Sequence, residues 1–217
     1  PATQAALGAP EVVKAEDADL AVRKAPENAA PVGADGVVRV EHAWILSRLA
    51  AASAAADGGL RAFDMGAAAD AVHHFWLKDL ADVFLEVSKP LLKSDDADLV
   101  SATREVLYTC LDVGLRLLHP FMPFVTEELW QRLPRRPATP ATSHLPQYES
   151  VMMAPYPVPS STSHLACASA EESQALAMSA VSAVRSLRGK YTIPKSTKIA
   201  VRLPGGPPAG ADAVVAG

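Results

Sequence analysis

Residue types that could carry chemistry are sparse in this chain, and their spacing assembles no catalytic group. His73 and His74 are adjacent, whereas two helical histidines that share a metal ion need a spacing of three or four residues. Asp79, Asp82 and Glu86 recur at helical spacing and could hold a cation, but a solvated helix face explains them better. No glycine-rich loop follows a predicted strand, and no base is paired with the loop hydroxyls. We therefore expect no catalytic residue and no metal site.

Charge is distributed unevenly along the 217 residues, whose formal net charge is −4. Residues 1–100 carry 16 acidic and 9 basic groups, whereas residues 101–217 carry 8 acidic and 11 basic groups. No acidic residue occurs between Glu172 and Asp212, a stretch that contains six Arg and Lys residues. A surface of one sign can attract phosphate, and a solvated basic tail explains the same distribution.

The two cysteines indicate neither a disulfide framework nor a metal site. Cys110 lies in an apolar helical run and is expected to be a buried thiol. A reducing compartment follows, and we expect a cytoplasmic location. No stretch is long and apolar enough to span a bilayer, and no signal peptide is visible. Because the chain begins at Pro1 in low-complexity sequence, we expect a fragment of a larger protein.

Apolar periodicity predicts an antiparallel bundle of four helices between residues 41 and 134. Gly58 and Gly59 are expected to end the first helix, and Asp64 to cap the second. Pro90 is expected to close the second helix, the third to start near Asp95 and Asp96, and Pro123 to begin the fourth. Each helix carries large apolar residues on a single stripe, and three tryptophans on these stripes are expected in the core: Trp44, Trp76 and Trp130.

The flanking segments differ in composition from the bundle. Residues 1–40 are rich in Ala, Pro and Gly and are expected to form a linker or surface excursion. Residues 135–168 are expected to be an irregular loop, either a mobile insertion or a segment wrapped over the surface. Residues 169–217 are expected to hold a basic helix ending near Lys190 and a strand at 198–203, the start of a truncated α/β subdomain. The predicted fold is therefore mainly α, with a small C-terminal helix–strand piece.

Four segments in this order resemble the anticodon-binding region of the valyl-tRNA synthetases, which are class I aminoacyl-tRNA synthetases. Residues 41–49, EHAWILSRL, are similar to the family pattern that ends in WILSRL. Residues 75–90, FWLKDLADVFLEVSKP, are similar to FWxxxxxDxYLExxKP, with Phe84 in place of the usual Tyr. Residues 118–130 read LHPFMPFVTEELW, the most specific of the four, and residues 183–188 read AVRSLR.

This resemblance implies a domain of a valine–tRNA ligase that reads the anticodon stem-loop of tRNA-Val. The ligase signatures His-Ile-Gly-His and Lys-Met-Ser-Lys-Ser do not occur in the chain. We therefore expect the fragment to have no aminoacylation activity and no cofactor of its own, while ATP and Mg²⁺ serve the parent enzyme. The expected partners are tRNA-Val and the catalytic and editing domains of the same chain, and the fragment is expected to be monomeric with no membrane contact.

Candidate RNA contacts are aromatic or basic residues that lie off the core stripes. Phe63, just after the glycine pair, is nominated as a platform for base stacking, with the resemblance implying an aromatic residue there. The others are basic residues that could contact phosphate or base edges: Arg48, Lys78, Arg132, Arg135, Arg136, Arg185, Arg188 and Lys190. For each, core packing, an ion pair or a solvated surface is the alternative.

Two other functions fit the sequence. The first is an anticodon domain of the isoleucyl or leucyl type, which would prefer a different tRNA from a valyl-type domain. A helical protein-interaction module differs in class, and the acidic first hundred residues favour it. RNA binding should weaken steeply with salt, whereas a packed helix–helix contact should not.

Overall fold

The computed structural model describes residues 39–134, 148–194 and 197. Its first long helix, α2, spans Val40–Arg61 and is followed by α3 (Met65–His74), the π-helix η1 (Phe75–Phe84) and α4 (Leu85–Leu91). The remaining elements are α5 (Ala97–Leu118), α6 (Pro123–Arg132), η2 (Val151–Met153), α7 (Pro159–Thr162), η3 (Ser163–Leu165) and α8 (Ala168–Lys190). The described residues are mainly helical and contain no strand, and the strand expected at 198–203 lies outside them.

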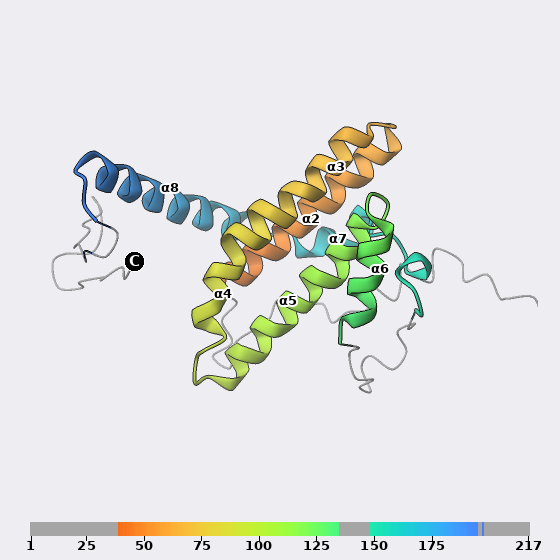
Figure 1. Ribbon diagram of the computed structural model, residues 1–217, viewed down its shortest axis with the longest axis horizontal. Helices are drawn as coiled ribbons and strands as arrows, with labels where there is room; N and C mark the ends of the chain where they lie inside the picture. The colour runs from red at the N-terminus through yellow and green to blue at the C-terminus, as the bar shows by residue number, and fades with distance from the viewer. Residues whose placement is uncertain (1–38, 135–147, 195–196, 198–217) are drawn as a thin grey trace, which may run out of the picture. The chain divides into compact units, whose positions relative to one another are not determined.

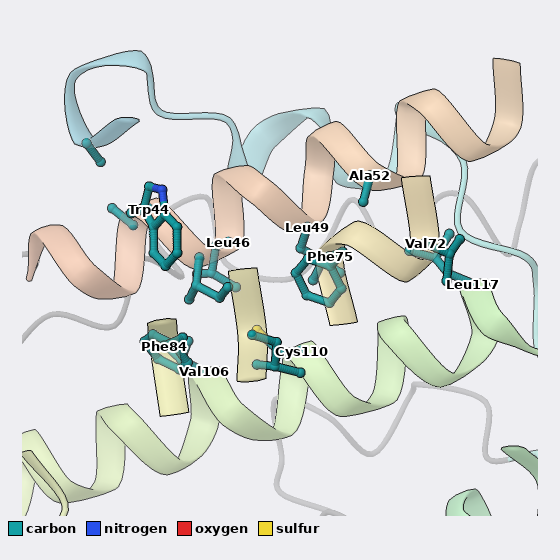
Figure 2. Close-up of a cluster of buried hydrophobic side chains, with 14 of the residues drawn as sticks. Trp44, Leu46, Leu49, Ala52, Val72, Phe75, Phe84, Val106, Cys110 and Leu117 are labelled. Atoms are coloured by element: carbon teal, nitrogen blue, oxygen red, sulfur yellow. The ribbon is translucent and has the colours of Figure 1, made fainter. Parts of the chain in front are cut away.

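The chain divides into two compact units, residues 1–170 and residues 171–217. In the first unit, α2 and α3 form an antiparallel hairpin, and α5 packs against α2 (Figure 1). Figure 2 shows Leu49 of α2, Phe75 and Phe84 of η1 and Cys110 of α5 meeting in one apolar core, as expected for Cys110. Burying each large side chain stabilises the bundle by roughly 1.5–3 kcal/mol.

The three tryptophans occupy different depths. Trp44 and Trp130 are buried, as the sequence predicts. Trp76 is half-buried and packs against both apolar clusters of this unit, and its indole Nε1 donates a hydrogen bond to the Gly114 carbonyl at 3.2 Å. A Cβ at Gly114 would lie 3.0 Å from the Trp76 ring, so the glycine allows this indole to approach α5.

The glycine pair does not end the first helix, which continues to Arg61. Gly59 instead lies where α2 meets α3, and a Cβ there would be 2.8 Å from the Ala68 nitrogen and 3.0 Å from the Asp64 carbonyl oxygen. Gly58 faces open space. The contact between α2 and α3 therefore requires a glycine at position 59 and not at position 58.

The second predicted helix is interrupted by a π-helix that the sequence does not reveal. Asp64 caps α3 as predicted, its carboxylate accepting a hydrogen bond from the Ala67 nitrogen at 2.9 Å, but Pro90 lies inside α4 rather than closing it. Through η1 the buried positions are Phe75, Leu80 and Phe84, a spacing wider than in an α-helix because π-helical hydrogen bonds join residues five apart. Asp79, four residues after Phe75, is buried as well, so the prediction of a solvated face is wrong for this residue.

The third and fourth helices match their predicted starts. Asp96 accepts hydrogen bonds from the Asp98 and Leu99 nitrogens, and Pro123 begins α6. The motif at 118–130 has a structural role here, since the Trp130 indole donates to Asp112 at 3.1 Å. Glu127 accepts from the Ser150 hydroxyl at 2.8 Å and from the Val151 nitrogen at 3.0 Å, which attaches residues 148–153 to α6.

Residues 148–167 form a segment that packs along the bundle and is called the strap below. It contains η2, α7 and η3. The Ser53 hydroxyl donates to the Pro157 carbonyl at 3.1 Å, and Arg116 donates to the Pro155 carbonyl at 3.2 Å. The Cys167 nitrogen donates to the Ser47 hydroxyl at 2.9 Å. The strap therefore covers one side of α2, and together with α3 and α5 it accounts for the buried residues of this helix.

A buried histidine joins α2 to α5. His42 is fully buried, and its Nε2 lies 3.0 Å from the Thr103 Oγ1. Because the Thr103 hydroxyl already donates to the Leu99 carbonyl, it must accept the Nε2 proton, which leaves Nδ1 unprotonated. The buried Nδ1 has no hydrogen-bond partner within the described residues. Burial lowers the pKa of His42, and Arg39 lowers it further against the opposing effect of Glu41.

The glycine pair gives the first prediction. Gly58→Ala should raise the free energy of unfolding by up to about 1 kcal/mol, since alanine favours the helix and meets no atom. Gly59→Ala should lower it by about 1–3 kcal/mol through overpacking against α3. Urea denaturation of the two variants measures both, and equal effects would contradict the assigned helix contact.

His42 gives the second prediction, on pH. The native pKa lies below the unfolded value of about 6.5, so the unfolded state binds the proton first. Stability is fully present above pH ~6.5 and falls as the pH drops toward the native pKa, by at most about 1.4 kcal/mol per pH unit. His42→Gln should flatten this dependence in denaturation curves between pH 8 and pH 5. The matched control His73→Gln changes an exposed ring and should retain the wild-type slope.

Candidate nucleic-acid interface

The turn between α2 and α3 presents a phenylalanine to solvent. Phe63 is 88% exposed and has a φ of 58°, in the left-handed region. The Asp64 nitrogen donates to the Gly59 carbonyl at 2.8 Å and the Phe63 nitrogen to the Leu60 carbonyl at 3.2 Å. These two bonds form a Schellman motif, in which the left-handed position is usually glycine.

A bulky residue in this conformation is costly. For an L-residue the left-handed region costs about 1–2 kcal/mol, and an exposed ring recovers little of that by packing. The turn thus holds an aromatic face in water at the expense of stability. Such outliers cluster at binding sites, which supports the nomination of Phe63 as a stacking platform.

Arg48 does not lie freely on the surface. Its Nε donates to the Asp79 Oδ2 at 3.0 Å, and its side chain is 31% exposed against 11% for Asp79. The His74 Nδ1 lies 3.5 Å from the same oxygen. The structure therefore brings together α2, α3 and η1 at one carboxylate. The spacing of Phe75 and Asp79 places the carboxylate on the buried face, but the sequence does not show which cations lie against it.

Two other candidates lie on exposed helix faces with acidic neighbours. The Lys78 Nζ pairs with Asp82 at 3.0 Å, and the Arg132 Nε pairs with Glu128 at 2.8 Å. Both pairs are one helical turn apart and well exposed, so each contributes only a few tenths of a kcal/mol. Such weak pairs leave both cations available for exchange onto a phosphate.

The remaining candidates belong to other parts of the chain. Arg135 and Arg136 lie outside the described residues. Arg185, Arg188 and Lys190 lie on α8, and all three belong to the second unit. Arg188 donates to the Pro194 and Thr197 carbonyls, at 2.5 and 3.0 Å, and therefore holds the end of α8. Arg185 and Lys190 are exposed.

A second phenylalanine is as exposed as Phe63 but differs in its surroundings. Phe124, in the first turn of α6, is 90% exposed. Its backbone φ, unlike that of Phe63, is not positive. Glu127 and Glu128 follow on the same helix, and their charge opposes a phosphate backbone. Phe63 is therefore the better platform for an unpaired base.

The described residues hold no group of three or more His, Cys, Asp and Glu side chains arranged to bind a metal ion. None of their helices is long and apolar enough to cross a membrane.

Most of the chain matches a known protein family. Residues 42–203 match the family model described as the anticodon-binding domain of tRNA ligase. The chain belongs to this family. The match begins at His42 and takes in the α2–α3 hairpin, the strap and α8.

Relatives of this anticodon-binding domain are valine–tRNA ligases. The chain is 49% identical to the valine–tRNA ligase of Rattus norvegicus over 154 residues, 70% of this chain and 12% of the rat protein. It is 48% identical to that of Homo sapiens over 151 residues, 69% of this chain and 11% of the human protein. The human mitochondrial valine–tRNA ligase is 41% identical over 154 residues, 71% of this chain and 14% of that protein. The chain thus spans only about one eighth of the length of such relatives.

The turn generates a prediction about stability that is independent of RNA. Phe63→Gly should raise the free energy of unfolding by about 1 kcal/mol, because glycine adopts the left-handed conformation without the steric cost. Thermal denaturation of the full chain provides the measurement. Phe124→Gly is the control and should not stabilise, since it places glycine in the first turn of a helix. A Phe63→Gly variant less stable than wild type would show that the ring packs in the fold.

Proposed function

We propose that this anticodon-binding domain recognises the anticodon stem-loop of tRNA-Val as part of a valine–tRNA ligase. The observation that carries the proposal is the solvent-exposed Phe63 ring, held in a left-handed turn at the tip of the α2–α3 hairpin. The choice of valine rests on the relatives, which are valine–tRNA ligases. The nearest alternative is an anticodon domain of the isoleucyl or leucyl type. It would prefer a different tRNA, so measuring tRNA preference distinguishes the two.

Stacking suits this geometry. Bases in a hairpin loop are unpaired and can stack on an aromatic face, with nearby polar groups reading their edges. Phe63 lies in the turn between the end of α2 and the start of α3, and its ring is exposed, so a loop base can reach it. Lys78, Arg132, Arg185 and Lys190 are further cationic candidates for backbone contacts, as are Arg135 and Arg136 beyond the described residues.

In this proposal the aminoacylation reaction takes place on other domains of the parent ligase. The described residues offer no glycine-rich phosphate cradle, so they do not fit ATP, and we assign ATP and Mg²⁺ to other domains of the parent. Catalytic and editing domains of the same chain are the proposed protein partners. A monomeric, cytoplasmic fragment is the simplest state, and mitochondrial forms among the relatives make the compartment a matter for localisation experiments.

Binding of Phe63 variants tests the proposal. Phe63→Ala should weaken binding of the tRNA-Val anticodon stem-loop by roughly 1–3 kcal/mol, the size of one base stack. Phe124→Ala, which removes an equally exposed ring from α6, should bind as wild type does. Fluorescence titration with the full 217-residue chain measures both.

Selectivity is checked in the same titrations. An anticodon-swapped stem-loop and the tRNA-Ile stem-loop should bind more weakly than the tRNA-Val stem-loop. Equal loss with Phe63→Ala and Phe124→Ala, or no preference among the three RNAs, would refute anticodon recognition by this turn.

One observation favours a second candidate, a protein-interaction surface. Met122, Phe124, Val125 and Leu129 are all at least 42% exposed on or beside α6. An exposed apolar helix face is typical of a contact with another protein or domain. Binding through this face would persist at 200 mM salt, whereas RNA binding should weaken strongly between 50 and 200 mM.

A further inference from the structure

The buried carboxylate of Asp79 connects the core of the bundle to its surface. It lies in the middle of η1, on the buried side of this helix with Phe75 and Leu80. Its Oδ2 accepts from the Arg48 Nε at 3.0 Å and lies 3.5 Å from the His74 Nδ1. A single oxygen is therefore shared by groups from α2 and α3. Irregular π-helical turns occur frequently at functional sites.

Exposure increases outward from this oxygen. The Asp79 side chain is 11% exposed, that of Arg48 31% and that of His74 56%. The Arg48 guanidinium uses Nε for Asp79, and no hydrogen bond from its Nη groups to another described residue accompanies this contact. Because the guanidinium is a rigid planar fork, fixing Nε also fixes the direction of both Nη groups.

The surface of α2 between Arg48 and the turn is smooth. Ala51, Ala55, Gly58 and Ala62 follow Arg48 at spacings of three or four residues, and all four are exposed. No side chain on this stripe is larger than a methyl group. At 1.5 Å per residue, Arg48 lies about 22 Å along the hairpin from Phe63. A nucleic-acid strand advances about 3.4 Å per stacked nucleotide, so the stripe matches roughly six nucleotides.

We propose that Arg48 binds a backbone phosphate of the RNA whose loop base stacks on Phe63, and that Asp79 is the positioning residue for this contact. The inference rests on the proposed function and deepens it. The anionic oxygens of a phosphate match the paired donors of a guanidinium, and such charge-assisted hydrogen bonds are stronger than neutral ones. The smooth stripe lets the strand lie close to α2 between the two contacts.

The sign of one substitution separates this role from simple charge. Asp79→Asn removes a negative charge beside the proposed phosphate, so unspecific electrostatics alone would make RNA bind more tightly. If Asp79 positions Arg48, the same substitution should weaken RNA binding. A neutral amide holds Arg48 less firmly, and the guanidinium then loses its fixed direction. Asp82→Asn is the matched control, since it removes an acid on the same π-helix whose side chain is 58% exposed and paired with Lys78.

Binding of the tRNA-Val anticodon stem-loop to the full chain provides the test. Asp79→Asn should weaken binding roughly tenfold, the size of one charge-assisted contact. Asp82→Asn should leave binding unchanged or tighten it slightly. Arg48→Gln should weaken binding and reduce the slope of log affinity against log salt by about 1, whereas Phe63→Ala should leave that slope unchanged.

Folding is checked by thermal denaturation of each variant. If Asp79→Asn does not fold, Arg48→Lys replaces it, since lysine keeps the charge and can still reach Asp79 but lacks the planar fork. That variant should bind more weakly with its salt slope retained. Binding of a folded Asp79→Asn or Arg48→Lys variant at wild-type strength would overturn the positioning role. If the wild-type chain prefers the tRNA-Val loop while these variants bind normally, this inference alone fails. If the wild-type chain shows no preference, the proposed function fails first.

Discussion

The close approach of α2 and α3 at Gly59 is the constraint from which the candidate interface follows. The absence of a side chain there lets the backbone of α3 lie against α2, so the chain must reverse within the few residues between Arg61 and Met65. Helices commonly end with a residue in the left-handed region where the chain reverses sharply, and Phe63 occupies that position. The exposed ring is therefore a consequence of how tightly the hairpin closes.

The π-helix exerts a second, longer-range constraint. An α-helix running from Met65 to Leu91 would turn Leu80 and Phe84 away from the face that carries Phe75. The wider π-helical turn places Leu80 and Phe84 in the core together with Phe75, and Asp79 lies on the same buried side, where its attraction to Arg48 is screened less than in water. Packing of apolar side chains thus determines where the charged pair lies. Because the pair is only partly covered, water still solvates the outer part of the guanidinium, and the cost of burying its charge is avoided.

Sequence reasoning located the helices well and their contacts less well. Periodicity and capping residues predicted the starts at Asp64, Asp96 and Pro123, since these signals are local. The role of Gly59 and the depth of Asp79 depend on neighbouring helices, which local patterns do not encode. The exposure of Phe63 decides between the two alternatives for this residue, a stacking platform or core packing, in favour of an exposed ring, while its positive φ is visible only with the hydrogen bonds of the turn. The proposed contacts of Arg135 and Arg136 stay predictions.

The strap has a consequence for how sequences of this family can diverge. Ser53 and Arg116 hold it through the carbonyl oxygens of Pro157 and Pro155, and Ser47 holds it through the nitrogen of Cys167. Main-chain atoms are the same whatever residue supplies them, so these anchors specify the path of the strap and leave its outward side chains unspecified. The exposed Met152 and Met153 can therefore be exchanged for other residues without moving α2. The strap is thus a surface on which new recognition properties can evolve while the hairpin beneath it keeps its shape.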